Sequence, residues 1–269
     1  MSTPCRIVSL AAAIFLCSFF ASTGFAGQVD VRYPEGSAHG LFLIRSMDNK
    51  EIGNGDLVET LEDGHVKSVF VLTFKDGSIY RETSLFEQHQ QFKLLNYQLT
   101  QKGPMFKQDI EMTIDVGARS VSVQSMENGK TKKWNEHMDM PADLANGIVP
   151  YLVRNMAANS RGATVSMIAA SPKPRLVHLL ITPRAEETFP FDGSKMRATR
   201  YRIHPDVSGV TGSLAKITGK QPPNSFLWML SDKVPTFLMA QEAFEDGPTC
   251  RIELATPIPT HGVDDKSGD

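Results

Sequence analysis

Apolar and polar side chains alternate along much of this chain with a period of two. The clearest run spans residues 106–116, where even positions are mostly apolar and odd positions are charged or polar. Successive side chains on a β-strand point to opposite faces, so this run predicts a strand with one apolar face, whereas a helix would scatter both kinds. Similar runs predict strands at 40–46, 56–61, 66–74, 78–86, 91–101 and 120–126.

Three dipeptides with turn chemistry separate these runs: Asp63-Gly64, Asp76-Gly77 and Asn128-Gly129. Each accepts the positive φ angles of a two-residue hairpin turn. Strands joined by such tight turns pair antiparallel with their sequence neighbours, because parallel pairing needs a long crossover connection. We therefore expect residues 38–137 to form an antiparallel meander.

The alternation stops after the meander, and a helical pattern replaces it. Leu144, Ile148 and Tyr151 recur at helical spacing, which predicts a helical segment over 141–158. Pro150 lies inside this segment and lacks a backbone donor, so we expect a kink or two short helices.

Strand-like runs resume as a second set over 163–255. Prolines are frequent here, which suits edge strands and loops rather than a second layer of helices. The predicted strands are 163–169, 175–181, 196–204, 212–218, 225–230 and 251–255. Together the patterns predict a mainly β fold: an antiparallel meander curved into an open half-barrel or barrel-like sheet, with the helical segment packed on it. We expect one β-rich domain over 27–256 and a flexible tail at 257–269.

The first 26 residues have the three parts of a secretory signal peptide. Arg6 gives a basic start, residues 7–20 are apolar, and Gly24 and Ala26 supply small side chains before a cleavage point. The apolar stretch is shorter than the roughly 20 residues that span a bilayer as a helix. An uncleaved anchor and a lipoprotein modified at Cys17 are the alternatives. We predict cleavage near Ala26 and a periplasmic or secreted protein with no transmembrane segment in its mature chain.

Composition excludes some partners. The formal net charge is −2, so the composition lacks the excess of basic residues that binds nucleic acid or an anionic membrane surface. Hydrophobic residues make up 41% of the chain, enough for an ample core. Cys250 is the only cysteine beyond the leader, so we expect no internal disulfide and interpret it as a small buried hydrophobe.

Two stretches near the end of the chain carry a family resemblance. Residues 226–235 read Phe-Leu-Trp-Met-Leu-Ser-Asp-Lys-Val-Pro, and residues 250–254 read Cys-Arg-Ile-Glu-Leu. They resemble the closing strands of an uncharacterised family of exported bacterial β-proteins with an open half-barrel, and the turns at 74–78 and 103–106 agree with this. That family's general form, with a helix in the concavity, is loosely similar to the lipoprotein-localisation factors of the bacterial envelope. The resemblance implies a fold and a compartment but carries over no catalytic or ligand-contacting residue.

Metal and catalytic patterns are weak. His137, Met138 and Met140 are weak candidates for metal ligands, because imidazole and thioether groups suit reduced copper. A metal site needs three or four convergent ligands, so we favour packing of the two methionines under the helix, and we predict no metal or cofactor. Ser166 lacks the Gly-x-Ser-x-Gly turn of a nucleophile, and His178, which alternates with leucines, is expected to be an inward-facing or half-buried residue of the core.

The acidic pair Glu242 and Glu245 is interpreted as solvated loop carboxylates. These observations favour a non-enzymatic protein, with a hydrolase kept as an alternative.

Some runs, such as 69–74, are apolar on both faces, which indicates that both sides of the sheet are covered over part of its area. On a curved sheet, apolar side chains around a concave mouth form pockets of the kind that ligands use. A filled core explains the same pattern equally well. We expect a pocket lined by Phe70, Leu72, Phe74, Phe106, Ile110, Met112, Leu144, Ile148, Tyr151 and Trp228.

The predicted function is binding or escorting a lipid or other apolar ligand in the cell envelope. The alternative is a structural or assembly factor that contacts another protein through an edge of the sheet, with the partner unidentified.

Overall fold

The computed structural model describes residues 29–170, 173–191, 194–206, 222–244 and 247–255. The expected signal peptide at 1–26, the predicted strand at 212–218 and the tail at 257–269 lie outside these ranges. Within the described part of the chain, no helix is long and apolar enough to cross a membrane.

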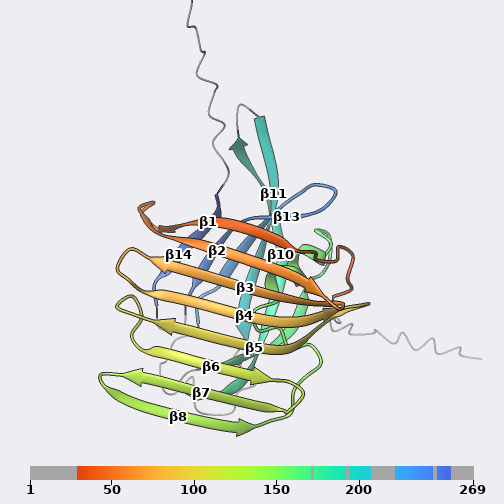
Figure 1. Ribbon diagram of the computed structural model, residues 1–269. Helices are drawn as coiled ribbons and strands as arrows, with labels where there is room; N and C mark the ends of the chain where they lie inside the picture. Colours follow the sequence, from red (N-terminus) through yellow and green to blue (C-terminus); the bar gives the residue numbers. More distant parts are fainter. Residues whose placement is uncertain (1–28, 171–172, 192–193, 207–221, 245–246, 256–269) are drawn as a thin grey trace, which may run out of the picture.

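The described residues form one antiparallel sheet of fourteen strands (Figure 1). Eight strands precede the helix α1 (Val149–Asn155): β1 (Ala38–Ser46), β2 (Glu51–Glu62), β3 (His65–Phe74), β4 (Ile79–Gln88), β5 (Phe92–Lys102), β6 (Asp109–Asp115), β7 (Ser120–Glu127) and β8 (Lys130–His137). Six follow it: β9 (Ala163–Ala169), β10 (Arg175–Phe191), β11 (Ser194–Asp206), β12 (Ser225–Leu230), β13 (Thr236–Ala243) and β14 (Thr249–Leu254).

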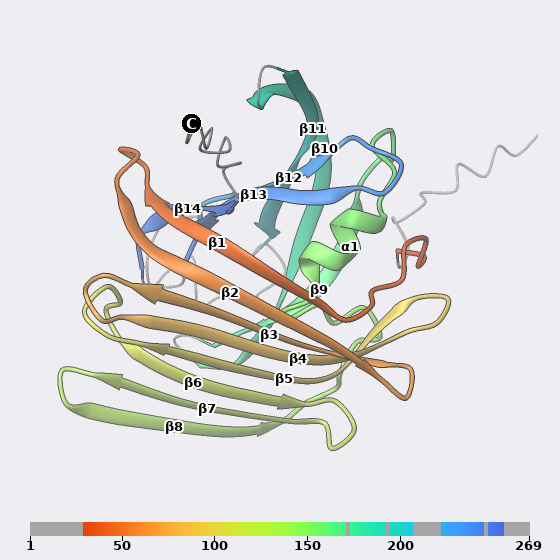
Figure 2. The same ribbon diagram turned by 45° about the horizontal axis from the view of Figure 1, so that its top comes forward.

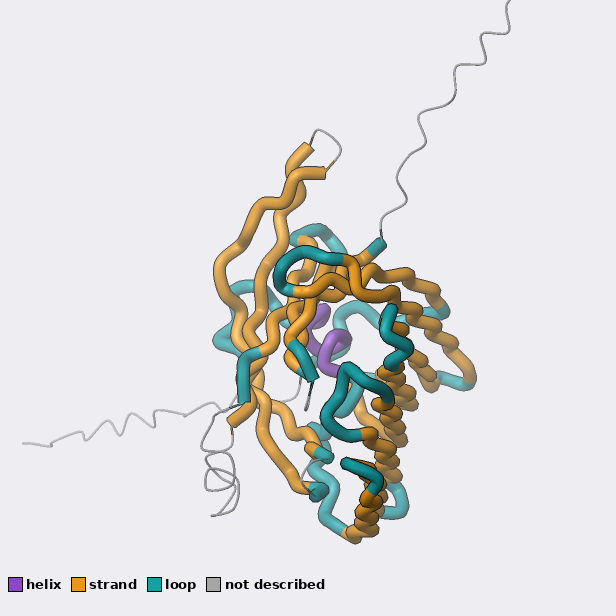
Figure 3. The backbone as a smooth tube through the Cα atoms, turned by 90° about the vertical axis from the view of Figure 1, so that its left-hand side faces the viewer, coloured by secondary structure: helices purple, strands orange, loops and turns teal. Residues whose placement is uncertain are grey.

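The two predicted strand sets join through β1 and β14. The order across the sheet runs from β8 back to β1, then from β14 back to β9. In the joining pair Ile44 lies opposite Ile252. Because β8 and β9 are the two ends and do not pair with each other, the sheet curves without closing (Figure 3). The predicted fold class, a mainly antiparallel open half-barrel with a helical segment, is confirmed.

The inward face of the sheet carries the core. Its side chains occupy the alternate positions that the period-two pattern assigns to one face. Inward-facing rings from strands that do not pair directly also meet: Phe42 on β1 and Phe237 on β13, with β14 between these strands, pack edge to face at 5.5 Å. The most deeply buried side chains include Ile44, Val66, Leu72, Phe86 and Ile114.

Two of the three predicted two-residue turns are confirmed. Asp63-Gly64 and Asn128-Gly129 connect strands directly, and their φ angles lie between 49° and 79°. The prediction of such a turn at Asp76-Gly77 is wrong, because a longer loop joins β3 to β4 and only Gly77 has a positive φ. The carboxylate of Asp76 accepts a hydrogen bond from the Ser78 N–H (2.9 Å), a side-chain contact that supports the turn while Asp76 itself avoids a positive φ.

The helix is shorter than the predicted segment 141–158. The chain before α1 pairs instead with β9: the Ala145 N–H donates to the Ser166 carbonyl (2.8 Å), and the Ser166 N–H donates to the Asp143 carbonyl (3.1 Å). This pairing satisfies backbone groups that a helix would otherwise have satisfied.

Two residues set the start of α1. Gly147, with φ at +70°, turns the chain out of the pairing with β9. Pro150 lies in the first turn of α1, where its missing N–H has no helical partner to lose, so it begins the helix instead of kinking it. The helix then lies inside the curve of the sheet, beside β12 and β13 (Figure 2).

The two ends of the sheet are protected in different ways. The outer edge of β9 is covered by Asn146, whose side chain bonds both the N–H and the carbonyl of Ile168 at 2.9 Å. Among the described residues no strand pairs with the other edge of β8, which carries Lys130, Lys132 and Lys133. Lysines on an edge strand disfavour pairing with another chain.

Candidate functional site

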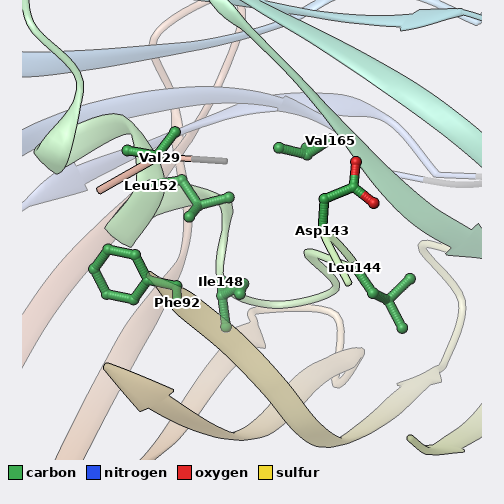
Figure 4. A pocket seen from close by; sticks show the side chains of 7 residues that line it. All are labelled: Val29, Phe92, Asp143, Leu144, Ile148, Leu152 and Val165. Carbon is green, nitrogen blue, oxygen red and sulfur yellow. The ribbon is translucent and has the colours of Figure 1, made fainter. Parts of the chain in front are cut away.

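A narrow apolar slot lies beneath α1, where the helix, the sheet and the segment before β1 meet. Its volume is about 10 Å³, which is room for about one water molecule. Figure 4 shows Asp143, the one charged group of the lining, beside the apolar side chains. The lining residues are Val29, Phe92, Asp143, Leu144, Ile148, Leu152 and Val165.

A wider, polar depression adjoins the slot, and we call it the vestibule. It has a volume of about 310 Å³ and is lined by Glu87, residues 89–93 and Ala142. Phe92 lines both hollows, so its side chain lies between the apolar slot and the vestibule. The charges at its rim largely offset each other, because Glu87 lies 3.7 Å from His65 and 4.0 Å from Lys93.

Polar contacts fix α1 inside the sheet. The hydroxyl groups of Tyr151 and of Ser68 on β3 share a hydrogen bond (2.7 Å). The side-chain amide of Asn155 donates to the Tyr151 carbonyl (2.8 Å), while its oxygen accepts the backbone N–H groups of Arg32 and Tyr33 (2.6 and 2.7 Å). The segment before β1 is therefore bonded to the end of the helix.

That segment, residues 29–37, forms a strap between α1 and the sheet. The backbone of Glu35 exchanges two hydrogen bonds with the side chain of Gln88 on β4 (2.6 and 2.7 Å). The carboxylate of Glu35 pairs with the guanidinium of Arg154 on α1. Arg154 also donates to the Pro235 carbonyl (3.1 Å), so one side chain links the helix to the strap and to the turn before β13.

Two buried carboxylates share this one cation. Burial raises the pKa of Glu35, although the neighbouring Arg154 acts to lower it. Burial likewise raises the pKa of Glu59 on β2, although a hydrogen bond from Tyr151 acts to lower it. The helix is thus held through Arg154 and its carboxylate partners, an ion pair that specifies where the helix lies.

A second pair of acids, Glu82 on β4 and Glu242 on β13, also faces the interior. Burial raises the pKa of both carboxyls, and that of Glu242 reaches about 7. The interpretation of Glu242 as a solvated loop carboxylate is wrong, because it lies on a strand opposite the fully buried Cys250. The same parity that buries Ala240 and Phe244 turns Glu242 inward.

The residues expected to line a ligand pocket lie mostly in the filled core. Leu144 and Ile148 line the slot. Phe74 and Phe106 pack edge to face at 6.0 Å, and Trp228 lies on the outer face, where its indole N–H donates to Glu187 (2.8 Å). The other members, all buried or partly buried with the core, are Phe70, Leu72, Ile110, Met112 and Tyr151.

Sequence reasoning missed the other half of the slot. Phe92, Leu152 and Val165 come from β5, α1 and β9, and nothing in their local spacing indicates that they meet. Phe92 and Val165 lie within the predicted strands 91–101 and 163–169, so the apolar pattern marks each as a core residue without marking the slot between them.

The weak metal candidates do not converge. His137 is exposed at the end of β8, while Met138 and Met140 are partly buried and pack against the core. Within the described ranges, no three His, Cys, Asp or Glu side chains gather as metal ligands.

A serine and a histidine do meet on the outer face of the sheet. Ser166 Oγ lies 3.5 Å from His178 Nδ1, and Asp206 is the neighbour of His178 on β11. Ser166 is 1% exposed, and its own N–H and carbonyl are used in pairing with residues 143–145, so it offers neither access nor an oxyanion site. His178 itself is exposed, so its predicted place in the core is wrong.

Comparisons with known proteins give one match. No protein-family model and no curated protein matches the sequence. Among solved structures, the chain is similar to a beta-barrel-like protein of domain of unknown function DUF1849 from Brucella abortus, with 9% identity and a TM-score of 0.41 over 86% of this chain and 97% of that chain. At that TM-score the likeness carries no argument about the site or its chemistry.

Proposed function

We propose that this protein binds a lipid or similar amphiphile in the cell envelope, with an apolar chain in the slot under α1 and a polar head in the vestibule. The observation that carries the proposal is that Phe92 lines both hollows, the small apolar slot and the wider vestibule with its mostly polar residues. Each buried methylene of such a chain contributes about 0.8 kcal/mol.

The slot is too small for a chain while α1 is in place. A ligand therefore has to displace α1, or part of it, and occupy the volume that Ile148 and Leu152 fill in the free protein. The helix has seven residues and no side-chain cap at its start. Helices shorter than about 12 residues are marginal on their own, so α1 keeps its conformation through its contacts and can be exchanged for another apolar occupant.

The vestibule favours a head group that is neutral or carries balanced charges. Glu87 offsets the positive charge of Lys93, so no strong field of one sign remains at the mouth. Gln90 and Gln91 supply exposed amide groups that form hydrogen bonds with hydroxyl, ester or amide groups.

Two features favour lipid binding over assembly at a sheet edge: the leader-like start of the sequence and the lysines on β8. The leader-like residues 1–26 suit an exported protein that works near membranes. The lysines on the free edge of β8 oppose strand addition, which the assembly function would use.

Titration of the purified full chain with a fluorescent fatty-acid analogue tests the proposal. Val165→Phe fills the slot from β9 and is expected to weaken binding at least tenfold. Val71→Phe places the same ring on the outer face of β3, where Val71 lies half-buried, and leaves the affinity unchanged. Equal affinities for the two variants, or no saturable binding by the wild type, would rule the proposal out.

A further inference from the structure

Glu82 and Glu242 approach each other across the interior from strands that are not neighbours. Four strands, β3, β2, β1 and β14, lie between β4 and β13 in the sheet. Curvature nevertheless brings the rings of Tyr80 and Phe244, each two positions from one of the acids, to 4.8 Å. The negative charge of Glu82 is close enough to raise the pKa of Glu242.

The two acids differ in their hydrogen-bond donors. Glu82 accepts the hydroxyl hydrogens of Tyr80 (3.0 Å) and Tyr97 (2.5 Å), whereas among the described residues Glu242 accepts that of Ser225 alone (3.1 Å). Donors stabilise the ionised form of a carboxyl group, so Glu82 ionises first and Glu242 keeps its proton longer.

The groups that face the pair supply no compensating cation among the described residues. Glu82 is faced by Tyr80 and Tyr97, and Glu242 by Ser225, Glu82 and the thiol of Cys250. Burial and the charge of Glu242 raise the pKa of Cys250 to about 12, so the thiol stays neutral. Within the part of the chain that the structure describes, a second negative charge here therefore has no cationic partner.

We propose that Glu242 is a proton switch that holds β13 and β14 closed against β4 while it is protonated and loosens them when it ionises. Two like charges in a low-dielectric interior repel each other and also lose hydration. Both penalties fall as more water reaches the pair, whose residues are already partly exposed in the closed state, and a shift of β13 away from β4 admits that water. This inference concerns the separation of β13 and β14 from β4 and does not depend on any ligand.

The raised pKa of Glu242 determines in which direction pH changes the closed arrangement. The pKa of Glu242 in the folded protein, about 7, lies above its ordinary value of 4.5. The closed arrangement of β13 and β14 against β4 is therefore favoured at acid pH. The stability that protonated Glu242 contributes to it is lost as the pH rises through 7.

Cys250 is a built-in probe of this opening. It is fully buried and lies directly opposite Glu242 in the strand pairing. Its alkylation rate in the full chain, measured by mass spectrometry on the peptide that contains it and divided by the rate for the unfolded chain at the same pH, gives a protection factor.

The protection factor of the wild type is expected to fall at least tenfold between pH 6 and pH 8.5. Glu242→Gln removes the charge and should hold the factor constant over that range, while the outer-face control Glu253→Gln should behave like the wild type. Ser225→Ala removes the donor to the anion, so it should move the fall to higher pH if Glu242→Gln does not fold. A wild-type factor that stays constant, or an equal fall in Glu242→Gln, overturns the proposal; so does an unmoved transition in Ser225→Ala.

Discussion

Arg154 on α1 pairs with Glu35, which lies 119 positions earlier in the chain. The pair joins the helix that fills the concavity to the strap that crosses it. The carboxylate side chain is only 5% exposed, so its charge depends on this partner more than on water. A buried ion pair contributes little net stability, but removing one partner costs several kcal/mol because the other charge is left unpaired.

Glu35→Gln should loosen α1 while leaving the sheet intact. Without the carboxylate, Arg154 keeps its bond to the Pro235 carbonyl but no longer ties the helix to the strap. Amide hydrogen exchange in residues 149–156 is expected to become at least tenfold faster, with exchange in β2–β5 unchanged. The matched control is Glu253→Gln, which breaks the outer-face pair with Arg45. Equal exchange at α1 in both variants would show that the pair does not hold the helix.

The stability of the whole protein should decrease from pH 5 to pH 8. The folded-state pKa values of Glu35, Glu59, Glu82 and Glu242 are all raised by burial. The folded protein therefore binds more protons than the unfolded chain between the ordinary pKa of 4.5 and about 7. The shift at Glu242 alone corresponds to a loss on the order of 3 kcal/mol. Thermal unfolding at the two pH values measures this, and a higher melting temperature at pH 8 would contradict the assigned burial.

Much of the fold could be predicted because the curved sheet buries one face, and burial of one face produces the alternation from which the strands were identified. β8 escaped this reasoning: its residues, Lys-Thr-Lys-Lys-Trp-Asn-Glu-His, are mostly exposed on both faces at the end of the sheet. The same limit explains His178. β10 is apolar on both faces there, so alternation did not reveal that Val177 and Leu179 point inward and His178 outward.

The candidate site could be predicted only in part, because it depends on which distant segments meet. Leu144 and Ile148 were expected near a pocket, but their partners Val29 and Val165 are brought to them by the strap and by the curvature of the sheet. One signal was available in the sequence. Glu82 has the same parity as the buried Ser84 and Phe86, so an acid on the apolar face of a strand was already visible.

Gly53→Ala should destabilise the protein strongly. A Cβ atom at Gly53 on β2 would lie 2.4 Å from the Thr73 carbonyl oxygen and 3.0 Å from the Ile44 side chain. Overpacking of this kind costs about 1–3 kcal/mol. Urea unfolding measures the change, and Gly36→Ala, whose added Cβ meets nothing within 4 Å, is the control. Similar losses in both variants would mean that the close packing of β2 on β3 is not as described.

The lysines of β8 should keep the protein soluble as a single copy. Replacing Lys130, Lys132 and Lys133 by threonine retains a strand-forming side chain but removes the charges from the free edge. Light scattering of the concentrated protein is expected to reveal association. Replacing three exposed lysines elsewhere, Lys67, Lys75 and Lys107, gives a variant of equal net charge. Association in that control to the same extent would point to net charge instead of the edge.

The most direct measurement of ligand binding is native mass spectrometry of the full chain purified from the cells that make it. We expect a one-to-one adduct with the mass of a lipid, reduced in Val165→Phe and retained in Val71→Phe. Spectra that contain only the bare protein, both as purified and after incubation with an excess of cell lipids, would contradict the binding of an apolar chain beneath α1.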